Sequence, residues 1–138
     1  MSTPHKDNAH GLAVVTGAGQ GLGAAIALEL ARAGFAVLLV ARSADALDKV
    51  RAQAAALNGD RAFALALDLL APDAVPRIQE AVAHAGIPLT CLVNNAGHGL
   101  YGRFADLPIA EQQRMMRLNM GVPVLLALAL LPLLLRSS

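Results

Sequence analysis

Short, continuous apolar runs alternate with longer segments of helical composition along this chain. The apolar runs are rich in Val, Leu and Ala without regular polar alternation, which is typical of strands buried on both faces of a sheet. The predicted strands are residues 11–16, 35–41, 61–67 and 89–93. The predicted helices are residues 24–33, 43–57, 72–85 and one long helix over 108–136, bent near Gly121 and Pro123.

This order of elements predicts an α/β fold. Strands that alternate with helices are joined by right-handed crossovers and form a parallel sheet. We therefore expect one doubly wound parallel sheet over residues 11–138, preceded by a flexible polar tail of residues 1–10. The 138 residues suit a single domain, because typical domains contain about 100–200 residues.

Composition narrows the class of protein. Hydrophobic residues make up 56% of the chain and charged residues 15%, with a mean hydropathy of +0.52, so disorder is excluded as a general description. Eleven Lys and Arg nearly balance ten Asp and Glu, and only 3% of residues are aromatic, so the sequence predicts no nucleic-acid partner. The single Cys91 and the four scattered His predict neither a disulfide nor a metal site.

The most apolar segment lies near the carboxyl end. Residues 118–135 carry no charge, and their length is at the lower limit for a membrane-spanning helix. Pro123 and Pro132 interrupt this segment, and the polar residues 1–10 do not fit a secretory signal. We therefore favour a helix buried in a protein core or interface, and a cytoplasmic protein, over a membrane-associated one.

A glycine-rich loop, residues 17–23, separates the first predicted strand from the first predicted helix. The amino terminus of a helix offers N–H groups and partial positive charge, and glycines let a phosphate approach the backbone. The loop fits T-G-x-x-x-G-x-G with Gly17, Gly21 and Gly23, or G-x-G-x-x-A from Gly19. It lacks the Lys of a kinase-type phosphate loop. A tight turn that binds no ligand is the alternative interpretation.

Together with a second motif, this loop resembles a known family. TGAGQGLG at 16–23 and NNAG at 94–97 follow the first and fourth predicted strands, and the pair resembles the short-chain dehydrogenase/reductase family. The resemblance extends to Asp68-Leu69 and Asn119 and covers nearly the whole chain. It implies a Rossmann-type sheet and hydride transfer between a nicotinamide dinucleotide and a small-molecule carbonyl or alcohol substrate.

The resemblance also implies a role for individual residues. Asp68 would hydrogen-bond the adenine amino group with Leu69 beside the ring, and Asn94 would tie its strand to the neighbouring ones. Asn119 would hold a water in the proton relay and is the candidate catalytic residue. The residues expected around the pyrophosphate are Thr16, Gly17, Gly19, Gln20, Gly21, Leu22 and Gly23, and those expected around the ribose next to the nicotinamide are Asn95, Ala96 and Gly97. Purely local roles are the alternative interpretation. Asp68 could cap a helix or turn, the two Asn could form a turn at the strand end, and Asn119 could mark a helix bend.

The end of the second predicted strand bears on the choice between NAD and NADP. Ala41 stands where an acid would bind the ribose 2′-hydroxyl of NAD, and Arg42 and Ser43 follow it. A guanidinium and a hydroxyl suit the 2′-phosphate of NADP. We therefore predict that NADP(H) is preferred and NAD(H) is possible. Asp45 is the competing acid, and a solvated Arg42 without a ligand is the alternative.

The Ser and the Tyr-x-x-x-Lys that carry out proton transfer in the resembled family have no match in this sequence. Tyr101 is followed four residues later by Ala105, and His98 and Arg103 are the remaining conceivable acids. We expect the chain to be the cofactor-binding half of such an enzyme, truncated after the fourth strand and the long helix. We also expect it to form homo-oligomers through that apolar helix. A catalytically inactive nucleotide-binding or dimerising remnant is the alternative.

Overall fold

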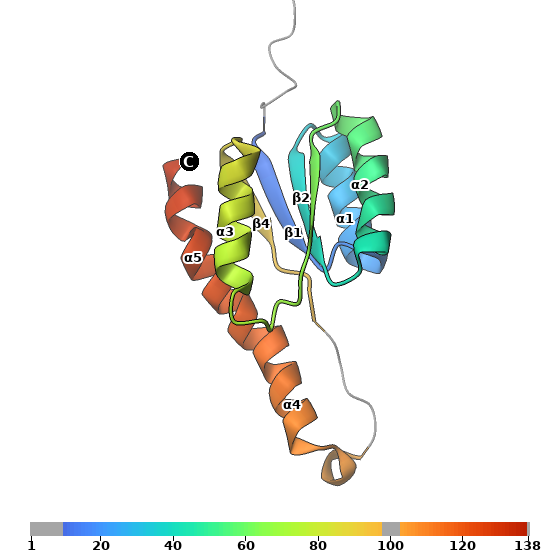
Figure 1. The fold of residues 1–138 in the computed structure, drawn as a ribbon, viewed down its shortest axis with the longest axis vertical. Helices are drawn as coiled ribbons and strands as arrows, with labels where there is room; N and C mark the ends of the chain where they lie inside the picture. The colour runs from blue at the N-terminus through green and yellow to red at the C-terminus, as the bar shows by residue number, and fades with distance from the viewer. Residues whose placement is uncertain (1–9, 98–102, 138) are drawn as a thin grey trace, which may run out of the picture.

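The predicted strands form one parallel sheet (Figure 1). The structure is a computed structural model that describes residues 10–97 and 103–137. The strands are β1 (Leu12–Thr16), β2 (Ala36–Ala41), β3 (Ala62–Ala66) and β4 (Leu89–Val93). All pairs are parallel and the strand order is β3-β2-β1-β4, which is the Rossmann-type doubly wound order. The predicted fold class is therefore confirmed.

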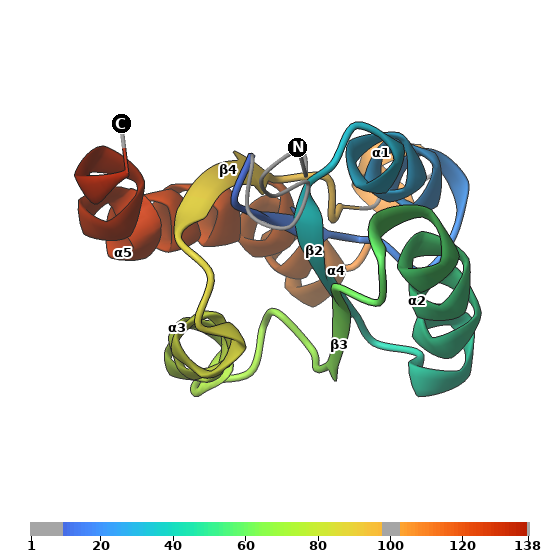
Figure 2. The ribbon, with the colours of Figure 1, turned by 90° about the horizontal axis from the view of Figure 1, so that it is seen from above.

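Helices cover both faces of this sheet, as the view from above shows (Figure 2). One face carries α1 (Gly21–Arg32) and α2 (Ala44–Asn58), and the other carries α3 (Ala74–Ala85) and α5 (Val122–Arg136). Parallel strands need crossover connections, and α1, α2 and α3 supply them by returning the chain to the edge where the next strand begins.

The core consists of two clusters that share the strands. In β1, Val14 joins a cluster with Ile78 of α3 and Leu126 of α5, whereas Val15 joins a cluster on the opposite face with Leu47 of α2. Successive strand residues point to opposite faces, so a strand covered by helices on both sides needs apolar residues at every position. This arrangement explains the continuous apolar runs of the sequence.

Local sequence sets the ends of α2, whereas the predicted start of α3 is wrong. The Ser43 hydroxyl accepts a hydrogen bond from the Ala46 N–H at 3.2 Å, and Gly59 ends α2 in the left-handed region. Helix α3 begins at Ala74, so Pro72 does not lie in its first turn as predicted. Hydrogen-bonded turns occupy the residues just before this helix, which postpones its start.

The long carboxyl-terminal helix is continuous but irregular. A 3₁₀ turn (Phe104–Asp106) precedes α4 (Ile109–Met116), and a π-helical turn (Arg117–Gly121) joins α4 to α5. The irregular turn therefore ends at Gly121, near which a bend was predicted, and Pro123 lies in the first turn of α5. Figure 1 shows that α4 extends beyond the carboxyl ends of the strands, whereas α5 lies against α3 and the sheet.

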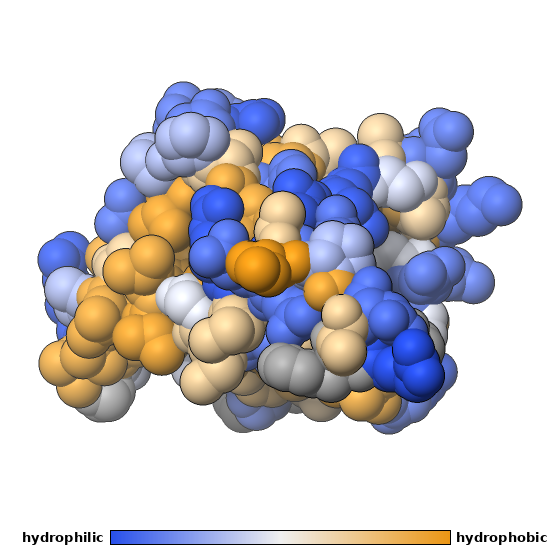
Figure 3. All heavy atoms as spheres, turned by 90° about the horizontal axis from the view of Figure 1, so that it is seen from below, coloured by the Kyte–Doolittle hydropathy of each residue, from blue (hydrophilic) through white to orange (hydrophobic). Residues whose placement is uncertain are grey.

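One side of α5 is not covered by the described residues. Leu126 and Leu130 are fully buried, but a row of large apolar side chains from α4 through the π-helical turn to α5 is exposed. We call this row the apolar stripe; its members are Met116, Met120, Val124, Leu125, Leu128, Leu131 and Leu135. Figure 3 shows hydrophobic residues gathered on this side of the molecule. By length and composition alone, the helical segment Ile109–Arg136 would suffice to cross a membrane.

Candidate functional site

A cleft of about 790 Å³ lies at the carboxyl ends of the strands. Its walls come from the β1–α1 loop, the ends of β2, β3 and β4, and the helical segment that begins with α4. In doubly wound sheets, ligands bind at this edge, where the strand order reverses. The predicted site residues that line the cleft are Gly17, Gly19, Gln20, Gly21, Arg42, Ser43, Asp68, Leu69, Asn95, Ala96 and Gly97.

The glycine loop presents bare backbone to this cleft. Helix α1 begins at Gly21 rather than at the predicted Ala24, so the motif glycines Gly21 and Gly23 lie in its first turn. Gly21 has a φ of +58°, and a Cβ built on it would meet nothing within 4 Å. Gln20 precedes the helix and makes no side-chain cap, and the first turn holds no acid. The first N–H groups of a helix have no partner within it, so this end can receive an anion.

Thr16 ties the glycine loop to the NNAG segment. Its side chain is buried, and its Oγ1 accepts hydrogen bonds from the backbone N–H of Asn95 at 3.0 Å and of Ala96 at 3.1 Å. The Asn95 amide donates to the Gly17 carbonyl oxygen at 3.3 Å. Thr16 does not line the cleft. These hydrogen bonds give Thr16 a positioning role between the glycine loop and the NNAG segment.

The π-helical turn brings the candidate catalytic residue close to NNAG. A Cβ built on Gly97 would lie 2.7 Å from Oδ1 of Asn119, so the two residues are in direct contact. The Asn94 amide donates to the Pro123 carbonyl oxygen at 3.3 Å, which ties the end of β4 to α5 rather than to a neighbouring strand. Asn119 itself lies beside the lining residue Leu118 but does not line the cleft.

The ends of β2 and β3 form the outer wall of the cleft. Arg42 and Ser43 both line it and are exposed, whereas the competing acid Asp45 does not line it. Asp68 also lines the cleft, and its Oδ1 accepts a hydrogen bond from the Leu70 N–H at 2.9 Å. Asp68 therefore has the local turn role that the sequence left open, and it also lies in the wall of the cleft.

Sequence reasoning missed part of the wall and included residues outside it. Leu22 and Gly23 do not line the cleft, because Leu22 points into solvent and Gly23 packs on Gly17. Lining residues that were not predicted to contact the cofactor are Ala41, Ala46, Leu67, Leu70, Arg114 and Leu118. Four of them directly adjoin a predicted residue in the sequence, namely Ala41, Leu67, Leu70 and Leu118. Ala46 and Arg114 have no such neighbour and reach the cleft through the tertiary fold.

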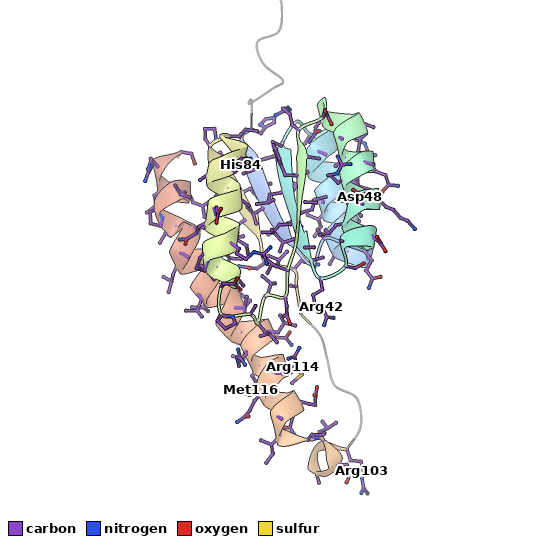
Figure 4. The ribbon with its side chains drawn as sticks, viewed as in Figure 1. Arg42, Asp48, His84, Arg103, Arg114 and Met116 are labelled. Atoms are coloured by element: carbon purple, nitrogen blue, oxygen red, sulfur yellow. The ribbon has the colours of Figure 1, made fainter. Side chains whose placement is uncertain are left out.

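The remaining candidate acids do not join the cleft in the described part of the chain. Arg103 pairs with Asp106 through a 2.7 Å salt bridge and lies at the far end of the molecule from the sheet (Figure 4). His98 and Tyr101, like the predicted tail residues 1–9, lie outside the described residues.

Comparison with known proteins identifies the family. The family model described as short chain dehydrogenase matches residues 11–138. The chain belongs to the short chain dehydrogenase family. An uncharacterized oxidoreductase of Mycobacterium tuberculosis is 35% identical over 127 residues, which are 92% of this chain and 48% of the relative.

Two solved structures of this family show the same fold. An alcohol dehydrogenase from the archaeon Thermococcus sibiricus, complexed with 5-hydroxy-NADP, has a TM-score of 0.84 at 34% identity and covers 91% of this chain and 53% of its own. L-sorbose reductase from Gluconobacter frateurii, complexed with NADPH and L-sorbose, has a TM-score of 0.85 at 30% identity, with coverage of 94% and 49%. The chain thus spans about half the length of the relatives it matches.

Proposed function

We propose that the cleft binds NADP(H), with the pyrophosphate at the bare backbone between Gly17 and Gly21. The observation that carries this proposal is the open space beside Gly21 at the start of α1, where a Cβ would meet nothing within 4 Å. Backbone N–H groups and the helix dipole would bind the two negative charges there. The open backbone at this end of the cleft supports a dinucleotide with its pyrophosphate there.

Arg42 and Ser43 would bind the 2′-phosphate of this cofactor. They follow Ala41 at the end of β2, so the position where an acid would bind the ribose of NAD is apolar. Arg42 forms no salt bridge within residues 10–97 and 103–137, so its guanidinium is available to an anion. The solved relatives with 5-hydroxy-NADP and NADPH support the same preference.

The other predicted residues would position the two ends of the cofactor. Asp68 and Leu69 would lie at the adenine, and the backbone of Asn95–Gly97 would lie at the ribose next to the nicotinamide. Asn119, in contact with Gly97, would hold a water for proton transfer. Bound NADPH supplies a hydride to a carbonyl carbon, and the family chemistry is oxidation and reduction of small carbonyl and alcohol substrates.

We propose that these 138 residues form the cofactor-binding half of such an oxidoreductase. The sequence contains no Tyr-x-x-x-Lys, so the proton donor of the complete reaction would come from outside it. Members of the short chain dehydrogenase family are typically soluble enzymes, and we extend this to a cytoplasmic location. The apolar stripe on α4 and α5 would form an interface with a second copy, which sedimentation analysis would detect.

The test is a fluorescence titration of the purified 138-residue chain with NADPH and NADH. We expect saturable binding of both nucleotides, with NADPH bound more tightly. Gly21→Val should abolish most of this binding because its side chain would occupy the phosphate position. If neither nucleotide binds saturably, the proposed function is wrong. If NADH binds as tightly as NADPH, the assignment of Arg42 is wrong.

A second measurement separates the proposed half-enzyme from an inactive remnant. The chain that binds NADPH is incubated with a panel of ketones and aldehydes while NADPH absorbance is followed. Unchanged absorbance for the isolated chain, with activity restored by a polypeptide that carries the Ser and Tyr-x-x-x-Lys half, is the expected result. Binding without any activity under both conditions would favour the dimerising remnant.

A further inference from the structure

We propose that Arg114 is a second arginine for the adenosine 2′-phosphate and approaches it from the wall opposite Arg42. This inference rests on the proposed function, because it needs a dinucleotide in the cleft. Arg42 enters from the end of β2, and Arg114 enters from α4, the helix that extends beyond the sheet (Figure 4). Residues that are 72 positions apart in the sequence therefore line one cleft.

Arg114 has no salt-bridge partner among the described residues. All three salt bridges among the described residues join an arginine to an acid three positions away. The pairs are Glu29–Arg32, Asp48–Arg51 and Arg103–Asp106. Glu111 lies three residues before Arg114 on the same helix, yet these two side chains form no salt bridge. Arg114 lines the cleft.

A neighbouring arginine connects the π-helical turn that follows α4 to the end of β3. Nη2 of Arg117 donates to the Leu70 carbonyl oxygen at 3.4 Å, which joins the helical segment to the turn that follows β3. Leu70 and Leu118 line the cleft together with Arg114. Arg114 is therefore at the wall formed by the turn after β3, where Asp68 and Leu69 also lie.

The charges of the lining residues favour an anion at this end. Among the described residues of the wall, Arg42 and Arg114 are basic and Asp68 is the acid. Oδ1 of Asp68 accepts a hydrogen bond from the Leu70 N–H, so the negative charge of this carboxylate is partly balanced within the turn. Two guanidinium groups in one cleft repel each other, and an anion between them removes that repulsion. A phosphate monoester is the group on NADP(H) that matches two arginines and the Ser43 hydroxyl.

The test compares Arg114→Gln with Arg77→Gln in titrations with NADPH, NADH and 2′,5′-ADP. Arg77 is an exposed arginine of α3 outside the cleft, so its variant removes the same charge elsewhere. We expect Arg114→Gln to weaken NADPH and 2′,5′-ADP about three- to tenfold and NADH less than about twofold. The loss should shrink in high salt, and Arg77→Gln should bind like the unchanged chain.

Four outcomes decide between this inference and the proposed function. Equal losses for NADPH and NADH would place Arg114 at the adenine or pyrophosphate and overturn the inference. Unchanged binding of all probes would also overturn it. If Arg42→Ala abolishes the NADPH preference while Arg114→Gln does not alter it, the proposed function stands and only the inference fails. If the unchanged chain binds neither NADPH nor NADH, the proposed function fails first and the inference falls with it.

Discussion

The backbone of Gly23 lies so close to Gly17 that a Cβ on Gly23 would approach the Gly17 carbonyl oxygen to 2.0 Å. The same Cβ would lie 2.5 Å from the side-chain amide nitrogen of Asn95. Gly23 therefore packs the first turn of α1 against the loop and the NNAG segment. Gly21, two residues earlier, has open space beside it and lines the cleft. Two glycines of one motif thus serve packing and ligand access separately.

This difference predicts that alanine mainly lowers stability at Gly23 and mainly weakens cofactor binding at Gly21. Gly23→Ala should lower the free energy of unfolding by about 3 kcal/mol, because backbone atoms must move to admit the methyl group. Gly21→Ala should cost only about 1–2 kcal/mol from its left-handed φ, and should mainly weaken NADPH binding. Urea denaturation and NADPH titration of both variants measure the two effects. Equal stability losses with equal binding would contradict the separation of roles.

Thr16→Val should destabilise the chain by about 2–3 kcal/mol. Its hydroxyl accepts from the N–H groups of Asn95 and Ala96, and valine leaves both without this buried acceptor. Thr90→Val is the matched control, because the Thr90 hydroxyl donates to the His10 carbonyl oxygen at an exposed site and should change stability by less than about 0.5 kcal/mol. Thr16→Ser should restore most of the stability. Similar urea midpoints for Thr16→Val and Thr90→Val would refute the positioning role.

Ser43→Asp should change cofactor preference without loss of helix stability. Ser43 caps α2 by accepting the Ala46 N–H, and aspartate caps helices as well as serine does. The new carboxylate would lie in the cleft wall, where it repels a 2′-phosphate and can accept from a 2′-hydroxyl. We expect the NADPH-to-NADH affinity ratio to fall by about tenfold or more. Ser43→Ala should instead cost about 1 kcal/mol of stability from the lost cap, and an unchanged ratio in Ser43→Asp would count against the 2′-phosphate site.

Leucines on the two sides of α5 should respond differently to truncation. Leu126 is 0% exposed and Leu128 is 61% exposed. Leu126→Ala should lower the free energy of unfolding by about 2–5 kcal/mol through the cavity it leaves, and Leu128→Ala by less than about 0.5 kcal/mol in dilute protein. Both values come from denaturation curves of the soluble chain. Equal losses of unfolding free energy in the two variants would show that α5 does not pack on the sheet in solution. A helix inserted in a membrane would give that result.

The strands and most helices could be predicted from the sequence because their signals are local. Runs such as residues 35–41 are apolar at every position and short, and this pattern favours strands covered on both faces. Ser43 caps the start of α2, and Gly59 ends this helix in the left-handed region. Both roles are the ones that serine and glycine favour at helix ends. The prediction that α3 starts at Pro72 is wrong because hydrogen-bonded turns between β3 and α3 include this residue. Those turns depend on how β3 ends, and the presence of a proline does not reveal that.

The lining residues that belong to sequence motifs could be predicted, whereas lining residues such as Arg114 could not. Gly21 and Asn95 belong to motifs whose spacing relates them to a phosphate and to a strand end, and both line the cleft. Arg114 carries no such signal, because only the continuation of α4 through the π-helical turn brings it above the sheet edge. Thr16 was predicted as a contact because it opens the motif, but its hydroxyl is buried between two strand ends.

The most direct test of the dinucleotide cleft is a ³¹P NMR titration of NADP⁺ with the 138-residue chain. The pyrophosphate and the 2′-phosphate give separate signals, so the spectrum reports which group the protein contacts. We predict saturable shifts of both signals with the unchanged chain, loss of both with Gly21→Val, and selective loss of the 2′-phosphate shift with Arg42→Ala. Phosphorus signals that do not move at saturating protein would contradict a dinucleotide site at the start of α1.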